Sequence, residues 1–369
     1  MSLDISWFSR HKIKLLAIVI IAIVTGSIVG IVLWVTTQQT TKTTLYCYHA
    51  GSLTEPYAAY AAMWTSLNPT YSVFNDPYGS STAIKQCTEN EKPTDLIGSA
   101  DFLLIISMMM EKQVTGQSYN YSDWYIITSK NEMAIAYKAA NTPPYLTELL
   151  AGTKKWYEVM NGTDVIIGRA DPYQDPCGYR TLMTWGLADD YVYGIGEGNW
   201  TKNTINQSFY NKDPIIGYAG TGANVVKGKE VDLISTLQAG EIDYLFIYKS
   251  VALQQGLSYI GLDPHMALND SSLTTFYRNV TVSRDSPLIP GASASDVTAS
   301  PIVYGLTIPN VAPNEAAAIQ YVKFMLSNPG VWIDTFQTPV WPYLTNNVSA
   351  LPTALQPYCV NDPDYGVLY

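Results

Sequence analysis

The chain has 369 residues, of which 47% are hydrophobic and 14% are charged, and its formal net charge is −10. This length is sufficient for two packed domains, or for one large domain, with an additional segment. The negative charge and the lack of a basic run with interleaved aromatics beyond the N-terminus exclude a typical nucleic-acid-binding protein.

The first predicted element is a transmembrane anchor. Residues 15–35 form an apolar run without a charged residue, long enough to span a bilayer. Basic residues at 10–14 precede it, so the positive-inside rule places residues 1–14 in the cytoplasm. A cleaved signal peptide is the alternative, but the run is longer than a typical signal core. We expect a single-pass cell-membrane protein with a stalk at 36–43 and an extracellular soluble part.

Two features fit an extracellular location. Seven glycosylation sequons, which would make the protein a glycoprotein, begin at Asn120, Asn161, Asn199, Asn206, Asn269, Asn279 and Asn347. Four cysteines can form up to two disulfides in an oxidising compartment: Cys47, Cys87, Cys177 and Cys359. Cys47 with Cys87 is the most local pairing, and free buried thiols are the alternative.

Strand, turn and helix patterns alternate in the first part of the soluble chain. Strands are expected at 45–50, 73–74 and 95–100, and helices at 55–67, 83–89 and 101–110. This alternation indicates an α/β domain with parallel strands, whose ligands bind beyond the carboxyl ends of the strands. The small-residue turns Gly51-Ser52 and Gly79-Ser80 fall there, although a helix cap is the more ordinary role for Ser52.

The second part of the chain continues the same pattern. Further strands are expected at 123–128, 133–137, 242–247, 258–260, 276–282 and 302–309, and further helices at 145–151, 154–160, 228–238 and 312–326. The break at 141–144 and the strand at 302–309 are candidate domain boundaries. The polar segment 191–213 is expected to be an exposed insertion, and 284–300 a flexible loop.

The stretch 170–180 has the features of a ligand site because it joins a strand at 164–168 to a helix. Asp175 stands at the N-cap position and Pro176 at the first helical position. We expect the free N–H groups of Cys177 and Gly178 to favour an anion, with an ordinary capped helix as the alternative.

The polar turns together indicate a site for a compact anion, bound by N–H and O–H donors. They are Gly51-Ser52, Gly79-Ser80, Asp175-Pro176-Cys177 and Tyr248-Lys249-Ser250. Neither a P-loop nor a Gly-x-Gly-x-x-Gly motif is present, which argues against nucleotides. Zinc motifs are also absent from the sequence, which has three histidines, and we expect no cofactor.

Eight further motifs follow one another along the soluble part of the chain. They are His49-Ala50-Gly51-Ser52-Leu53, Gly79-Ser80, Asp95-Leu96-Ile97-Gly98-Ser99-Ala100-Asp101, Asp123-Trp124-Tyr125, Asp175-Pro176-Cys177-Gly178-Tyr179-Arg180, Lys229-Glu230-Val231-Asp232-Leu233, Ile242-Asp243-Tyr244-Leu245-Phe246-Ile247-Tyr248-Lys249-Ser250-Val251-Ala252 and Pro301-Ile302-Val303-Tyr304-Gly305. In these motifs and in their order, the chain resembles the archaeal tungstate/molybdate-binding proteins of ABC importers.

The resemblance implies an α/β, two-lobed periplasmic-binding-protein fold of type II, each lobe a mixed sheet flanked by helices. Lobe one would comprise 44–132 and 306–369, and lobe two 133–305, with the ligand in the cleft between them. It also implies a monomeric receptor, not an enzyme, which delivers tungstate or molybdate to an ABC permease with its ATPase. The oxyanion-binding residues that it implies are Gly51, Ser52, Ser80, Asp175, Pro176, Cys177, Glu230 and Tyr248.

Two of these residues, Asp175 and Glu230, are linked in the family to six-coordinate binding of the tungsten or molybdenum centre. Two carboxylates repel a dianion unless their oxygens reach the metal centre itself. Tungsten and molybdenum expand readily from four to six oxygens, whereas the sulfur of sulfate does not, so the pair would select against sulfate. Asp232 is the alternative to Glu230, and Ser81 to Ser80.

Two other functions stay open. A receptor for sulfate or another tetrahedral oxyanion would use the same donors, but the acidic pair argues against it. A cell-surface serine hydrolase would use Ser52 with His49 and Asp175, but no Gly-x-Ser-x-Gly elbow is present. A strand histidine such as His49 is also more often a packed, hydrogen-bonded residue.

Overall fold

The computed structural model describes residues 42–196, 201–214, 224–282 and 296–362. The chain divides into two compact units, Met1–Thr43 and Thr44–Tyr369. The predicted anchor at 15–35 lies outside the described residues, as does most of the expected loop at 284–300. Within the ranges described, no helix combines the length and the apolar character needed to cross a membrane.

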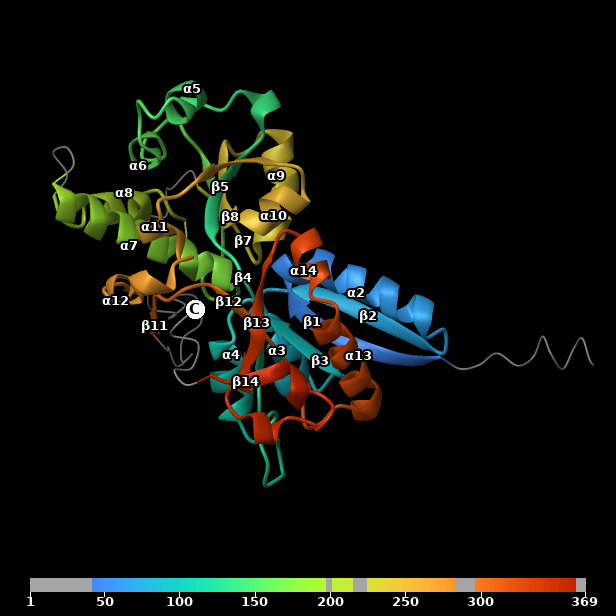
Figure 1. The fold of residues 1–369 in the computed structure, drawn as a ribbon. Coiled ribbons are helices and arrows are strands. Elements are labelled where there is room, and N and C mark those ends of the chain that lie inside the picture. Colours follow the sequence, from blue (N-terminus) through green and yellow to red (C-terminus); the bar gives the residue numbers. More distant parts are fainter. Residues whose placement is uncertain (1–41, 197–200, 215–223, 283–295, 363–369) are drawn as a thin grey trace, which may run out of the picture. The chain divides into compact units, whose positions relative to one another are not determined.

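The first of two main sheets, which with its helices we call lobe one, has seven strands (Figure 1). Their order across the sheet is β14 (Cys359–Asn361), β13 (Thr338–Thr345), β4 (Ile126–Lys130), β12 (Val303–Thr307), β3 (Leu96–Ser99), β1 (Thr43–Ala50) and β2 (Tyr71–Tyr78). β1 and β3 are parallel, with Cys47 opposite Leu96, whereas β12 runs antiparallel to both β3 and β4. The sheet is therefore mixed.

The second sheet, which with its helices we call lobe two, has five strands. Their order is β7 (Val225–Lys227), β6 (Ile167–Ala170), β8 (Tyr244–Tyr248), β5 (Met133–Tyr137) and β9 (Ser258–Gly261). β6 is parallel to β7 and β8, and β5 is antiparallel to β8 and β9. A short ribbon of β10 (Thr281–Val282) and β11 (Val297–Thr298) stands apart from both sheets. The prediction of a two-lobed α/β fold with mixed sheets is confirmed.

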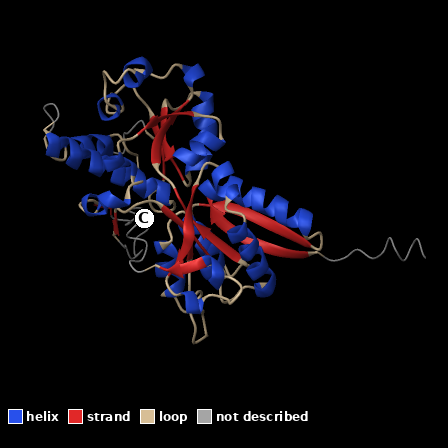
Figure 2. Ribbon diagram, viewed as in Figure 1, coloured by secondary structure: helices blue, strands red, loops and turns tan. Residues whose placement is uncertain are grey.

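Helices flank both sheets (Figure 2). In lobe one they are η1 (Gly51–Leu53), α2 (Thr54–Leu67), α3 (Ser80–Thr88), α4 (Leu103–Ile105), η2 (Ile106–Met110), α13 (Glu315–Ser327), α14 (Gly330–Asp334), η6 (Val348–Ala350) and η7 (Gln356–Tyr358). In lobe two they are η3 (Ala139–Asn141), α5 (Leu146–Leu150), α6 (Trp156–Val159), α7 (Pro176–Ile195), α8 (Thr204–Asn211), η4 (Glu230–Leu233), α9 (Ile234–Ala239), α10 (Lys249–Gln254), α11 (Pro264–Ala267), η5 (Ser271–Leu273) and α12 (Thr274–Tyr277).

Strand β1 shows why lobe one has a core on each face of its sheet. Alternate side chains of a strand point to opposite faces. Leu45 and Cys47 pack in the cluster that includes α2, whereas Tyr48 packs in the cluster that includes α3. Cys87, on α3, belongs to the second cluster. The suggested Cys47–Cys87 disulfide is therefore wrong: the two thiols lie on opposite faces of the sheet, and all four cysteines are free and buried.

Two expectations about lobe two are also wrong. The segment 191–213 is not simply an exposed insertion, because α7 extends to Ile195 and α8 buries Ile205 and Phe209. The Phe209 ring stacks on Trp185 with centroids 4.8 Å apart, so packing outweighed the polar composition of the segment. The strand expected at 276–282 is reduced to β10, because its first residues complete α12.

Within the residues that the structure describes, the chain passes between the sheets twice. The first passage is short, since β4 ends at Lys130 in lobe one and β5 begins at Met133 in lobe two. On the return, β12 pairs with β4 from Val303 onward. The division of the chain at 132 and 306 stays a prediction, and the second of these positions lies inside β12.

Candidate functional site

Asp175 is held at the start of α7, as the sequence predicts. Its Oδ1 accepts a hydrogen bond of 2.9 Å from the Cys177 N–H, and Pro176 occupies the first helical turn. Its Oδ2 accepts one of 3.2 Å from the N–H of Glu230. A single carboxyl group therefore caps α7 and also fixes the start of η4, which brings together two segments that are distant in the sequence.

The Glu230 and Asp175 side chains form a buried carboxyl pair. Both are almost fully buried, with 1% and 2% of their surface exposed. Burial raises the pKa of Glu230 well above its ordinary value, and the charge of Asp175 raises it further. Burial also raises the pKa of Asp175, opposed by the Glu230 side chain and by backbone N–H donors. Like charges that approach in a dry site favour keeping a proton in the pair.

The surroundings of the Glu230 carboxyl oxygens fit a carboxyl pair that keeps one proton. Neither accepts a hydrogen bond from a donor in the part of the chain that the structure describes. Asp175, when ionised, offers only acceptors, so the two side chains bond to each other only through a shared proton. Asp232, the alternative acidic residue, is exposed and lies 3.8 Å from the Lys229 ammonium, so Glu230 is the residue that meets Asp175.

Gly51 and Ser52 approach this pair from lobe one. A Cβ on Gly51 would lie 3.6 Å from Glu230 Oε2 and 3.1 Å from Val231 Cγ2, so the backbone here lies close to η4. Ser52 is 1% exposed and its hydroxyl makes no well-aligned hydrogen bond within the described ranges. Burial raises the pKa of the Tyr304 phenol, and the nearby Ser52 hydroxyl acts in the opposite direction.

Ser80 is the first residue of α3 and is fully buried. Its Oγ accepts a 3.0 Å hydrogen bond from the N–H of Ala100, at the end of β3. Ser81 is also buried, with 9% of its surface exposed. The preceding Gly79 lies against lobe two, since a Cβ there would be 2.2 Å from the carbonyl oxygen of Gln174. Gly79 thus lets the turn that carries Ser80 pack beside Asp175.

Tyr248 ends β8 and is fully buried, with its ring edge-on to Tyr304 at 5.8 Å between centroids. Its hydroxyl accepts a 2.8 Å hydrogen bond from Arg180 Nη1. The same nitrogen donates to the Ala100 carbonyl at 2.6 Å. Arg180 belongs to a predicted motif but is not among the predicted binding residues. It lies just over one turn into α7 and reaches the site through these two bonds.

The expectation of free N–H groups at the start of α7 is wrong. The Cys177 N–H is taken by the Asp175 side chain, and the Gly178 N–H donates to the Asp175 carbonyl. Pro176 has no N–H group. The Cys177 thiol is buried, and burial raises its pKa. The donors at this site are therefore hydroxyl groups rather than a helix N-terminus.

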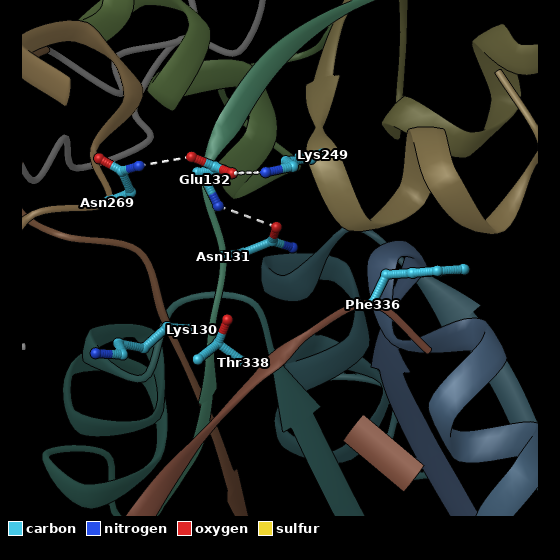
Figure 3. Close-up of a pocket in the computed structure, with 7 residues that line it drawn as sticks. All are labelled: Lys130, Asn131, Glu132, Lys249, Asn269, Phe336 and Thr338. Atoms are coloured by element: carbon cyan, nitrogen blue, oxygen red, sulfur yellow. Dashed lines mark hydrogen bonds and ion pairs between the residues drawn. The ribbon is translucent and has the colours of Figure 1, made fainter. Parts of the chain in front are cut away.

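Further hydrogen bonds join the lobes where the chain first passes between them (Figure 3). Asn131 Nδ2 donates to the hydroxyl groups of Ser250 and Tyr304, each at 2.7 Å. Figure 3 shows the Glu132 side chain between Lys249 and Asn269, to which it is bonded. A pocket of about 260 Å³ is lined by Asn131, Glu132, Lys249 and Asn269 with Lys130, Phe336 and Thr338, and by none of the predicted binding residues.

His49 does not form a catalytic arrangement with Ser52. Its Nδ1 pairs with the Ala50 carbonyl at 2.8 Å, and its Nε2 has no partner among the described residues. Burial lowers the pKa of His49 to about 4, so the ring is neutral at neutral pH. A serine nucleophile needs a base within hydrogen-bond reach, and this geometry does not provide one.

Residues 45–333 match the family model of bacterial extracellular solute-binding proteins. The chain belongs to this family. Two curated relatives are molybdate/tungstate-binding proteins, each named WtpA. The Pyrococcus abyssi protein is 36% identical over 80% of this chain and 83% of its own length. The Thermococcus kodakarensis protein is 35% identical over 78% of this chain and 79% of its own length.

One solved structure, the periplasmic molybdate-binding protein of Azotobacter vinelandii, covers 80% of this solute-binding protein and 98% of its own chain. Its identity is 13% and its TM-score is 0.45, which is too weak a similarity to support a conclusion.

Proposed function

We propose that this solute-binding protein is a receptor for tungstate or molybdate, which it holds between its lobes and delivers to an ABC permease. The observation that carries the proposal is the buried carboxyl pair of Asp175 and Glu230. Buried hydroxyl groups of Ser52, Ser80 and Tyr248 lie on segments that pack next to this pair. The names of the relatives in Pyrococcus and Thermococcus support the choice of ligand.

The carboxyl pair favours an oxyanion whose central atom accepts further oxygen ligands. Unpaired buried carboxylates are costly, and a tetrahedral dianion would add repulsion. Ligation of a tungsten or molybdenum centre by Asp175 and Glu230 would turn the same charges into an attraction. Glu230 has two oxygens without a donor and Ser52 has a hydroxyl without a well-aligned partner in the described ranges, so both are available to a ligand.

A sulfate receptor is the second candidate. The hydroxyl donors suit sulfate as well as tungstate, because both present only acceptor oxygens. Sulfur does not expand its coordination readily, so the two carboxyl groups would have no favourable role. The proposal therefore includes strong preference for tungstate and molybdate over sulfate.

The chain's organisation completes the proposal. Lobe one would be 44–132 with 306–369, and lobe two 133–305, with Gly51, Ser52 and Ser80 acting from the first. Asp175, Pro176, Cys177, Glu230 and Tyr248 would line the site from the second. Residues 15–35 would anchor the receptor in the cell membrane with its binding part outside.

Isothermal titration calorimetry of the purified full-length protein tests the proposal directly. Tungstate and molybdate should bind with one-to-one stoichiometry, and sulfate at the same concentration should give little or no heat. Binding of sulfate in preference to tungstate would support the second candidate. An absence of heat with all three anions would reject an oxyanion receptor.

A further inference from the structure

A path of hydrogen bonds joins two hydroxyl groups that belong to different lobes. Arg180 Nη1 donates to the Tyr248 hydroxyl at 2.8 Å and to the Ala100 carbonyl at 2.6 Å. The N–H of Ala100 donates to Ser80 Oγ at 3.0 Å. Tyr248 and Arg180 lie in lobe two, and Ala100 and Ser80 lie in lobe one. The path therefore crosses from one lobe to the other.

The path decides how each hydroxyl group can act. A guanidinium and a backbone N–H are donors only, so the oxygens of Tyr248 and Ser80 act as acceptors toward them. Each hydroxyl keeps its own hydrogen, and the described residues include no hydrogen-bond acceptor for either one. Both O–H groups are thus available to an anion that has only acceptor oxygens.

The contacts of Arg180 indicate that its side chain orients a neighbouring group and does not only pair with a charge. Its side chain is 3% exposed, and its two short contacts are to neutral oxygens, a phenol and a peptide carbonyl. The Asp101 carboxylate lies 3.8 Å from Nη2, beyond hydrogen-bond length. A cation whose only role was to neutralise the acidic residues would be expected to contact them directly.

We propose that Arg180 is a positioning residue for the oxyanion. It holds the Tyr248 hydroxyl as a donor toward the ligand, and it is itself held by the Ala100 carbonyl when lobe one is in contact. This inference rests on the proposed function, because it concerns a residue of the same site. Arg180 then affects affinity through Tyr248 and not by touching the anion.

A double-mutant cycle in the full-length protein, measured by tungstate calorimetry, tests this role. Arg180→Met should weaken tungstate binding by about 10–100-fold, the usual effect of removing a residue that orients a ligand group. Because Arg180 acts through Tyr248, the double variant with Tyr248→Phe should bind no more weakly than the weaker single variant. Tyr179→Phe is the control, since it removes a neighbouring bond to Asp101 without touching Tyr248.

The outcomes separate the two proposals. Wild-type protein that does not bind tungstate overturns both. If the wild type binds but the losses of Arg180→Met and Tyr248→Phe multiply in the double variant, the positioning role alone is overturned. In the control cycle, the losses of affinity caused by Tyr179→Phe and Tyr248→Phe should multiply. If these two changes were coupled as strongly as Arg180→Met and Tyr248→Phe, the positioning role would also be overturned.

Arg180→Lys covers the case in which the methionine variant does not fold. Lysine keeps the charge but ends one bond shorter and lacks the planar fork. The same cycle is then run with this variant, whose folding is checked by thermal unfolding without ligand. Wild-type affinity in a folded Arg180→Lys protein would overturn the positioning role, because charge would then be sufficient.

Discussion

Replacement of Glu230 by glutamine should change how the stability of the ligand-free protein depends on pH. Glutamine has the size of a protonated glutamic acid and can donate to Asp175 as that acid does, but it cannot ionise. Glu230 is 1% exposed, and burial and Asp175 raise its pKa well above the 4.5 of an unperturbed glutamate. The substitution therefore removes the ionisation and leaves the packing in place.

The direction of the pKa shift of Glu230 decides whether stability rises or falls with pH. When the folded pKa of an acid is raised, the folded state keeps a proton that the unfolded state has lost above pH 4.5. Stability from this group is complete below that pH and falls as pH rises toward the folded pKa. One proton corresponds to about 1.4 kcal/mol per pH unit, so Glu230→Gln should gain up to about 2 kcal/mol over wild type between pH 5 and 6.5.

His49 acts in the opposite direction in the same range. Its pKa is lowered from 6.5 to about 4, so the folded state binds fewer protons and stability rises with pH between these values. In the wild-type curve of stability against pH, the contributions of Glu230 and His49 therefore largely cancel, and this curve alone does not reveal the Glu230 contribution. The difference between the Glu230→Gln and wild-type curves removes the contribution of His49, which is common to both proteins.

Urea unfolding of the ligand-free protein at several pH values measures this difference. Asp232→Asn is the matched control, because it removes an exposed carboxylate two residues away and leaves the buried pair in place. A flat difference for Glu230→Gln, or one that decreases with rising pH, would refute the interpretation of a buried pair that keeps its proton.

Three other changes have defined outcomes. Neutralising both carboxyl groups, with Asp175→Asn and Glu230→Gln, should reduce the preference for tungstate over sulfate at least about tenfold by calorimetry, and an unchanged ratio would reject their role in selectivity. Gly79→Ala adds a Cβ 2.2 Å from the Gln174 carbonyl oxygen of lobe two, so it should lower the melting temperature of the ligand-free protein. An unchanged ligand-free melting temperature would contradict this close contact between Gly79 and lobe two. Arg169→Met removes the buried guanidinium that pairs with the buried Asp213 carboxylate and should destabilise by about 3–5 kcal/mol in urea unfolding, whereas a loss below about 1 kcal/mol would contradict this.

Local chemistry explains what the sequence predicted correctly. Asp175 followed by Pro176 predicts a capped helix start, because both preferences depend only on neighbouring backbone groups. The turn that carries Gly51 and Ser52 follows a strand and precedes a helix for the same kind of reason. The alternation of strand and helix patterns gave the α/β class, and the ordered motifs implied two lobes. These features depend on neighbouring residues in the sequence and not on which distant segments they contact in the fold.

Tertiary structure alone decided which distant groups meet. The sequence left Glu230 and Asp232 as alternatives. The hydrogen bond from the Glu230 N–H to Asp175 places Glu230 beside Asp175, and Asp232 lies at the surface. Packing also directed Arg180 toward Tyr248 and lobe one. Such contacts join residues more than 50 positions apart and depend on how two sheets and their helices fit together. A local pattern specifies the preference of a segment but not its partner, so the sequence determined the donors and acidic groups and the fold determined their pairing.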